Sequence, residues 1–308
     1  MCTSVCKTIN GIFLFGRNLD LDYDFGEGVV VLPVGYALPL RHTEALGERL
    51  GCAGVGCIAD GYPLLAEGMN EAGLCAAALD FPCMGRYADG CGDGLINLAP
   101  FEVLPYILGY CRSLDEAREV LSRCRIVDTP LSDKIKNTKM HYHIADRTGA
   151  VAVEIEGEQV KIYDNPFGTL TNAPDFSFHR DNMRLYSALE DRAPHDKGAL
   201  FTNGVGALGM PGDYTSPSRF VRSAWLCARL KAEVGCEEAA LGSVMGAVAV
   251  PRGSVTNASG KSHYTRYTSL LSPEEHSYTV FRCGTLTPSR YKIEKELLSG
   301  SSPSILRF

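Results

Sequence analysis

The sequence predicts a layered α+β fold in which strands and helices come in separate runs. Short apolar or alternating segments, each bounded by turn residues, occupy much of residues 2–79, 139–174 and 264–283, and two blocks with helical periodicity lie between these three ranges. Such runs favour an α+β architecture over regular βαβ winding. Neither an internal repeat nor a linker divides the 308 residues, so we expect one domain over residues 1–308.

The N-terminus predicts a β-hairpin. Residues 3–9 alternate small or polar with apolar side chains, Asn10-Gly11 can form a tight two-residue turn, and a short apolar run follows over residues 12–15. In an antiparallel pair, the start of the first strand lies beside the end of the second. We therefore expect Cys2 near Gly16 and Arg17, with Asp20 slightly beyond.

Further strands follow on both sides of a loop. The segments 28–34, 51–59 and 74–79 have strand character and are separated by turns at 61–63 and 69–73. A glycine-rich segment over residues 83–96 predicts a mobile loop that could gate a pocket. Later strands are expected as three segments within 139–163, a short one at 169–174 and closing strands at 264–271 and 277–283.

Helices are expected in two blocks. The first contains a buried helix over 97–110 and a helix to about Arg123, opened by a capping box of Ser113 and Glu116. The second block is expected at 178–190, 216–231 and 236–249, with a glycine-rich loop over 193–215 between them. Pro217 suits the first turn of its helix. The polar tail from Glu294 contains an isolated Ile305-Leu306 pair.

Composition excludes several classes of protein. A net charge of −6 and a pI near 5.7 argue against a nucleic-acid partner. No apolar run reaches the length of a membrane span, and the N-terminus lacks the pattern of a signal peptide. We expect no stable membrane association.

Twelve cysteines occur without a CxxC motif or a metal-ligand spacing, so they suggest small core residues with free thiols in a reducing cytoplasm. His141 and His143 alternate along a strand, and we expect them on a sheet surface and not as ligands. No metal and no organic cofactor is expected.

Cys2 follows the initiator methionine, and a small second residue favours removal of Met1. Cys2 would then carry a thiol and an α-amine, whose pKa of about 7.7–8.0 suits it to accept the thiol proton. Arg17 would favour the thiolate, and Asp20 could orient the ammonium form. The alternative is a frayed terminal cysteine beside an ordinary surface ion pair.

Five segments then resemble the choloylglycine hydrolase family, which comprises bile salt hydrolases and penicillin V acylases within the N-terminal nucleophile hydrolases. The similarity runs in order from residue 1 to about residue 290. The segments are 1–3, 15–20, 67–74, 170–174 and 210–220. The resemblance implies a four-layer αββα sandwich, with two antiparallel sheets between helix layers.

The resemblance also implies site residues. Cys2 would be the nucleophile, with Arg17, Asp20, Asn172 and Arg219 around it, and the side-chain amide of Asn172 would donate to the oxyanion. A second oxyanion donor would be the backbone N–H of Asp80. Bile salt hydrolases usually have Asn at this position and penicillin V acylases Tyr, so Asp80 bears on substrate choice. Arg222 is expected to be structural.

The function expected from the resemblance is hydrolysis of the amide bond in glycine- or taurine-conjugated bile salts. Penicillin V acylase or N-acyl-homoserine lactone acylase activity is an alternative, and a non-catalytic bile-acid- or lipid-binding protein is another. The presence of all five site residues argues against the non-catalytic alternative. A homotetramer or homodimer in the bacterial cytoplasm is expected.

Substrate-binding residues are expected in three segments, 20–25, 57–63 and 80–96. The individual candidates are Leu19, Asp22, Ile58, Ala59, Phe81 and Met84.

Overall fold

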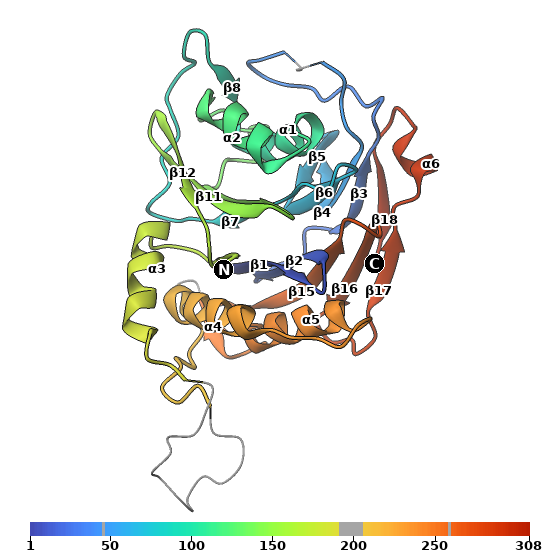
Figure 1. Ribbon diagram of the computed structural model, residues 1–308. Coiled ribbons are helices and arrows are strands. Elements are labelled where there is room, and N and C mark those ends of the chain that lie inside the picture. Colours follow the sequence, from blue (N-terminus) through green and yellow to red (C-terminus); the bar gives the residue numbers. More distant parts are fainter. Residues whose placement is uncertain (45–46, 191–205, 258–259) are drawn as a thin grey trace, which may run out of the picture.

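The chain folds into four layers in which two facing β-sheets lie between helices (Figure 1). The computed structural model describes residues 1–44, 47–190, 206–257 and 260–308. Helices α1 and α2 cover the outer face of one sheet, and α4 and α5 cover the outer face of the other. The expected αββα sandwich is confirmed.

The first sheet has seven strands and contains the N-terminal hairpin. Its order is β13-β1-β2-β15-β16-β17, and β14 pairs with β15. The bounds are β1 Cys2–Ile9, β2 Ile12–Leu21, β13 Thr169–Leu170, β14 Val255–Thr256, β15 Ser262–Ser272, β16 Ser277–Arg282 and β17 Ser289–Lys292. Asn10 and Gly11 both have positive φ, at 50° and 84°, as the predicted turn requires. The register pairs Cys2 with Leu19.

The second sheet has nine strands, and all its pairings are antiparallel. Its order is β12-β11-β10-β7-β6-β4-β3-β18, and β5 pairs with β4. The bounds are β3 Gly28–Leu32, β4 Cys52–Ala59, β5 Tyr62–Leu65, β6 Glu67–Asn70, β7 Cys75–Asp80, β10 Met140–Asp146, β11 Gly149–Glu156, β12 Gln159–Asp164 and β18 Ser304–Arg307. The three strands expected within 139–163 are confirmed.

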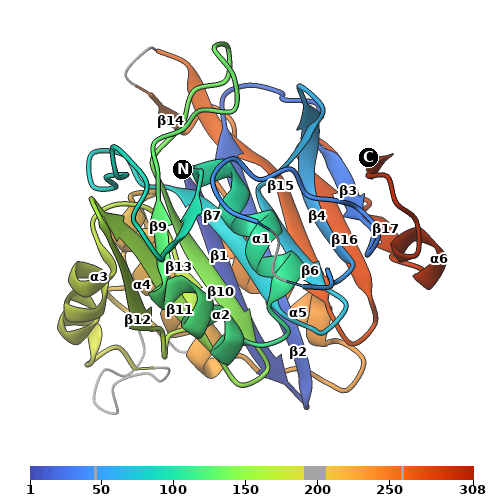
Figure 2. The same cartoon turned by 90° about the horizontal axis from the view of Figure 1, so that it is seen from above.

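The first helix block begins later than the sequence predicts. Residues 97–110 do not form one helix, because β8 (Ile96–Leu98) pairs in parallel with β9 (Cys124–Ile126). A 3₁₀ turn, η1 (Pro100–Glu102), then leads into α1 (Val103–Tyr110). Helix α2 (Leu114–Ser122) begins at the predicted Ser113 cap, whose hydroxyl accepts the Glu116 N–H. Both helices lie across the second sheet (Figure 2).

The second helix block is largely as expected. Helix α3 (Phe176–Asn182) is shorter than the predicted 178–190 and continues as the 3₁₀ helix η2 (Met183–Tyr186). Helices α4 (Ser216–Arg229) and α5 (Glu237–Ala247) agree with prediction within a few residues. Most of the loop expected over 193–215 lies outside the described residues.

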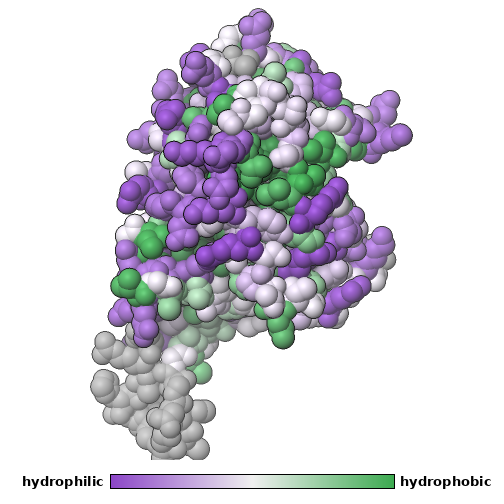
Figure 3. All heavy atoms as spheres, turned by 90° about the vertical axis from the view of Figure 1, so that its right-hand side faces the viewer, coloured by the Kyte–Doolittle hydropathy of each residue, from purple (hydrophilic) through white to green (hydrophobic). Residues whose placement is uncertain are grey.

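The C-terminal tail forms more structure than expected. Residues 289–292 extend the first sheet, α6 (Lys295–Leu298) follows, and Ile305-Leu306 belong to β18, which pairs with β3. The face that carries these elements shows a band of apolar surface at mid-height (Figure 3). Among the described residues, no helix has the length and apolarity that a membrane crossing needs.

The facing sheets enclose a core that also holds polar side chains. His141 and His143 are 0 % exposed, so their expected place on a sheet surface is wrong: this strand face is covered by the first sheet. All twelve cysteines are free. Seven are buried as expected, Cys57 is half-buried, and Cys83, Cys91, Cys236 and Cys283 are exposed.

Strand β15 contains a bulge between Thr265 and Tyr267, where the register against β2 shifts by one residue. Thr265 pairs with Asp20, whereas Tyr267 pairs with Leu19. In a regular strand residues 265 and 267 would point to the same face. Because of the bulge, Thr265 can contact Asp20 while Tyr267 points into the core between the sheets.

Candidate active site

The thiol of Cys2 lies between the two sheets, at the end of the hairpin. Cys2 is 3 % exposed, and Nη2 of Arg17 donates to its Sγ at 3.1 Å. Arg17 is in turn held by the second sheet, because its Nη1 donates to the carbonyls of Ala78 at 2.7 Å and Ala66 at 3.3 Å. The predicted proximity of Cys2 and Arg17 is therefore found, and the guanidinium spans the space between the sheets.

A buried carboxylate balances Arg17. Glu67 on β6 is 0 % exposed and accepts hydrogen bonds from Tyr267 at 2.9 Å and Ser269 at 2.7 Å. Burial opposes the charge on Arg17, but Cys2 and Glu67 outweigh burial, and the pKa of Arg17 is raised. Burial raises the pKa of Glu67, and Arg17 counteracts this.

Asn172 and Arg219 meet the main chain of Cys2. Oδ1 of Asn172 accepts the Cys2 N–H at 2.7 Å and a hydrogen bond from Arg219 Nη2 at 2.8 Å. Nη1 of Arg219 also donates to the Cys2 carbonyl at 2.5 Å, and to the hydroxyl of Thr3, a contact that the sequence did not indicate. Two donors on Oδ1 fix the amide so that its Nδ2 is free to donate elsewhere.

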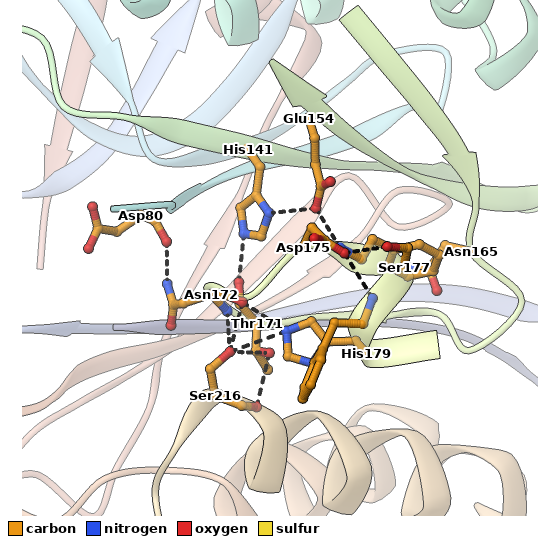
Figure 4. Close-up of polar contacts among 12 residues, drawn as sticks. Asp80, His141, Glu154, Asn165, Thr171, Asn172, Asp175, Ser177, His179 and Ser216 are labelled. Carbon is orange, nitrogen blue, oxygen red and sulfur yellow. Dashed lines mark hydrogen bonds and ion pairs between the residues drawn. The ribbon is translucent and has the colours of Figure 1, made fainter. Parts of the chain in front are cut away.

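The main chain of Asp80 accepts one of the two hydrogens on that nitrogen. Nδ2 of Asn172 donates to the Asp80 carbonyl at 2.7 Å. The Phe81 N–H donates to the Lys139 carbonyl, on the edge of β7 that faces β10. Because successive residues of a strand direct their N–H and carbonyl groups to opposite edges, those of Asp80 lie on the other edge of β7, toward Asn172. Figure 4 shows the Asp80 carboxylate on the far side of the main chain from Asn172.

Asp20 lies on a different face from the one that carries Arg17. Residues 17 and 19 of β2 point between the sheets, so Asp20 points toward the α4 and α5 layer. Its Oδ1 accepts from Thr265 Oγ1 at 2.6 Å, and its Oδ2 has no hydrogen-bond partner among the described residues. Burial raises the pKa of Asp20, against the charge of Arg219. The expected role of Asp20 in orienting the α-ammonium form stays a prediction.

Met1 continues the hairpin beyond Cys2. Its amino group donates to the Asp20 carbonyl at 3.0 Å, and the Asp20 N–H donates to the Met1 carbonyl at 3.0 Å. The backbone of Asp20 therefore holds the residue that precedes Cys2.

Arg222 has the structural role that we expected. It donates to main-chain carbonyls, those of Ala247 at 2.9 Å and Pro211 at 2.6 Å among them.

The candidate substrate-binding residues occupy different environments. Leu19 is buried and lies opposite Cys2 in the hairpin, and Phe81 is 1 % exposed and stacks on the ring of His141. The other four are at least partly exposed: Asp22, Ile58, Ala59 and Met84. The segment 83–96 is irregular and is anchored where the N–H groups of Arg86 and Ala88 bond to the carbonyls of Ile155 and Ile126. Its mobility stays a prediction.

An apolar cavity of about 190 Å³ lies on the helix-covered side of β5, β7 and β10. Ala78 and Met140 line it near the strand ends that hold Asp80. Leu64, Phe101 and Leu131 belong to its apolar lining, and Lys136, Asn137 and Thr138 add polar groups. The segment 129–142 was not among the expected pocket walls. Its apolar residues, alternating with polar ones in a turn-rich stretch, are the only sequence signal that could have indicated it.

Within the described ranges, no three or more His, Cys, Asp or Glu side chains are grouped so that they could hold a metal ion.

Comparisons with known proteins first give the class of enzyme. Residues 2–303 match the family described as "Linear amide C-N hydrolases, choloylglycine hydrolase family". The fold and this match define an amide hydrolase of the N-terminal nucleophile type.

Individual relatives cover nearly the whole chain. The conjugated bile acid hydrolase of Lactobacillus gasseri is 32% identical over 97% of this chain and 98% of its own length. The bile salt hydrolase/transferase of Clostridium perfringens is 34% identical over 90% and 88%. The structure of a C2A mutant of the conjugated bile acid hydrolase from Clostridium perfringens superposes with a TM-score of 0.89 at 30% identity, covering 100% of this chain and 97% of that one. The chain belongs to the choloylglycine hydrolase family.

Proposed function

We propose that this protein hydrolyses the amide bond of glycine- or taurine-conjugated bile salts, with Cys2 as the nucleophile. The observation that carries the proposal is the convergence of three side chains on Cys2. Arg17 faces its thiol, Asn172 faces its backbone nitrogen and Arg219 faces its carbonyl. The relatives named as bile acid hydrolases support the substrate class.

The chemistry begins with removal of Met1, which turns the Cys2 N–H into an α-amine. That amine would keep Oδ1 of Asn172 as an acceptor, and the unpartnered Oδ2 of Asp20 could balance its ammonium form. The amine takes the thiol proton, and the thiolate, beside Arg17, attacks the amide carbon. The α-ammonium then protonates the leaving amine, and water hydrolyses the thioester.

The oxyanion would lie between the second hydrogen on Nδ2 of Asn172, which the Asp80 carbonyl does not use, and the N–H of Asp80, since both face the same edge of β7. Loss of one such donor typically costs about 10²–10³ in rate. A carboxylate at residue 80 would oppose the oxyanion if it pointed the same way, but it lies beyond the main chain (Figure 4). Asp80 is thus compatible with turnover through its backbone.

The apolar part of the substrate would use the cavity next to Ala78 and Met140. Its volume of about 190 Å³ is below the roughly 300–1,000 Å³ of most ligand pockets. Only part of a steroid would fit inside, and the rest would extend over the partly exposed side chains Ile58 and Met84, which are 39% and 37% exposed. We assign a contact role to Ile58 and Met84 on this basis, whereas the contact roles of Leu19, Asp22, Ala59 and Phe81 rest on the resemblance to the family alone.

The test is a substrate panel of glycocholate, taurocholate and penicillin V, with release of glycine, taurine and 6-aminopenicillanic acid measured. We expect release of the amino acids and loss of all release in Cys2→Ala. Preferential cleavage of penicillin V would overturn the bile-salt assignment, and undiminished turnover by Cys2→Ala would overturn the nucleophile.

We also propose one catalytic domain over residues 1–308 that works as a homodimer or homotetramer in the bacterial cytoplasm. Twelve free cysteines suit a reducing compartment. Light scattering of the purified protein measures the assembly, and a monomer at micromolar concentration would contradict it.

A further inference from the structure

Two buried histidines face the main chain on either side of Asn172. His141 comes from β10 and His179 from α3, and both are 0 % exposed. Nε2 of His141 lies 2.8 Å from the Thr171 carbonyl, and Nε2 of His179 lies 2.9 Å from the Asn172 carbonyl (Figure 4). Neither histidine touches Cys2, so the proposed reaction leaves both without a role.

The partners determine which nitrogen carries the proton. A carbonyl oxygen can only accept, so Nε2 must be protonated in both rings. Nδ1 of His179 has no hydrogen-bond partner among the described residues, and burial lowers the pKa of His179 to about 4. His179 is therefore a neutral donor at neutral pH.

Each ring also stacks on a phenylalanine that follows a site residue. His141 stacks on Phe81, with ring centroids 4.3 Å apart and an 11° angle between planes. His179 stacks on Phe220, at 4.6 Å and 9°. Phe81 follows Asp80 and Phe220 follows Arg219, so each histidine joins the Asn172 main chain to the neighbour of another site residue.

Two further residues complete the arrangement. The Ser216 hydroxyl accepts the Asn172 N–H at 2.9 Å and donates to the Asn172 carbonyl at 2.8 Å. Glu154 accepts the N–H of Phe176, the first residue of α3, at 2.7 Å and lies 3.6 Å from Nδ1 of His141. The helix that carries His179 is thereby tied to the strand face that carries His141.

We propose that His141 and His179 are positioning residues that hold Asn172 in register with Asp80 and Arg219, and so set the spacing of the two oxyanion donors. The inference rests on the proposed function. His141 sets Asn172 relative to Asp80, and His179 sets it relative to Arg219. A main chain held at two successive carbonyls fixes the position of the Asn172 Cα, from which the amide reaches the reacting atom, and this Cα cannot shift without breaking buried hydrogen bonds.

The test compares two substitutions at each position. Gln places an Nε2 donor as many bonds from Cβ as histidine does, whereas Leu removes the donor. For His141→Leu and His179→Leu we expect kcat, per titratable Cys2 thiol, to fall about 10²-fold, the lower value for loss of one oxyanion donor. We expect KM to change by less than about twofold. The Gln variants should have a kcat at least about tenfold higher than that of the Leu variants.

His143 supplies the matched control, because it is buried on the same strand but bonds to the Ser4 hydroxyl, at 2.8 Å. His143→Leu should lower Tm and leave kcat per titrated thiol unchanged. Three outcomes would each overturn the inference. They are equal losses of kcat in the Leu and Gln variants, a rise in KM with unchanged kcat, and a loss of activity that is explained by fewer titratable thiols.

The comparison uses whichever linear amide of the panel the wild type cleaves fastest. Wild-type turnover of penicillin V alone would therefore refute the proposed substrate and leave the histidine test intact. A wild type that cleaves no amide of the panel would overturn both.

Discussion

Replacing Glu67 by Gln tests whether Arg17 depends on a buried countercharge. Both side chains lie between the sheets, Glu67 at 0 % and Arg17 at 1 % exposure. The amide keeps the shape of the side chain but removes its charge, and it replaces one of two acceptors by a donor that faces a hydroxyl, that of Tyr267 or Ser269. Within the described structure, the two charges attract each other without a hydrogen bond or close ion pair between them, so the roughly 3–5 kcal/mol typical of breaking a buried ion pair from one side is the upper range of the expected cost.

That cost converts into a thermal shift. With an unfolding entropy of about 2.1 cal/mol/K per residue, each kcal/mol corresponds to about 1.5 °C for a chain of 308 residues. Glu67→Gln should therefore lower Tm by up to about 5–8 °C in differential scanning calorimetry at pH 7. Arg17→Met should cost as much, since it leaves Glu67 and the carbonyl of Ala78 without their partner.

The control is Glu158→Gln, which removes a surface ion pair between Glu158 and Arg125. The side chain of Glu158 is 71% exposed. It should change stability by less than about 0.5 kcal/mol. The double variant Arg17→Met/Glu67→Met should lose at least about 1 kcal/mol less than the two single changes together. A Glu67→Gln protein within about 1 kcal/mol of wild type would show that Glu67 is neutral in the folded state, and the countercharge argument would fail.

Three other predictions concern processing, acid stability and the cavity. Mass spectrometry of the active protein should show loss of Met1, and Cys2→Ser should keep its Tm while turnover falls at least about 10³-fold; an active chain that retains Met1 would contradict the α-amine mechanism. Burial lowers the pKa of His143 to about 3, so the stability it contributes is complete above about pH 6.5 and lost as pH falls, by about 2 kcal/mol at pH 5. Urea unfolding at pH 7.5 and 5 gives the free energy of unfolding at each pH. Between these pH values it should fall by about 2 kcal/mol less in His143→Gln than in the wild type, and equal losses would refute the assignment. Ala78→Leu places three more carbons in the cavity and should raise KM for glycocholate about tenfold at unchanged kcat; an unchanged KM would exclude this cavity from substrate binding.

Local patterns predicted the parts of the fold that are set by nearby residues. Asn10-Gly11 determines the hairpin, and the hairpin alone places Arg17 beside Cys2. Pairing between distant segments was not predictable in this way. Residues 96–98 look helical by periodicity, but they pair with residues 124–126. The tail residues 304–307 gain their strand only from β3.

The site shows the same division. Alternation along β10 indicated that His141 and His143 share one face of the strand. It could not indicate whether this face is covered by water or by a second sheet, because a sheet that supplies polar partners, such as Ser4, also accommodates polar side chains. The family motifs led to Asn172 and Arg219, whose separation of 47 residues no local pattern could bridge. The position of Asp20 on the opposite face of β2 follows from its parity with Arg17, and this parity was available from the hairpin itself.

The bulge in β15 makes Arg266 the extra residue of this strand. Deleting Arg266 would restore a regular ladder in which Thr265 still lies opposite Asp20 and Tyr267 opposite Leu19, so the Thr265 hydroxyl would keep facing Asp20. Straightening the strand with Arg266 retained would instead turn Thr265 to the face that Tyr267 occupies. When this protein is aligned with its relatives, a gap at residue 266 is therefore compatible with the same neighbourhood for the second carboxylate, provided that Thr265 and Tyr267 are retained.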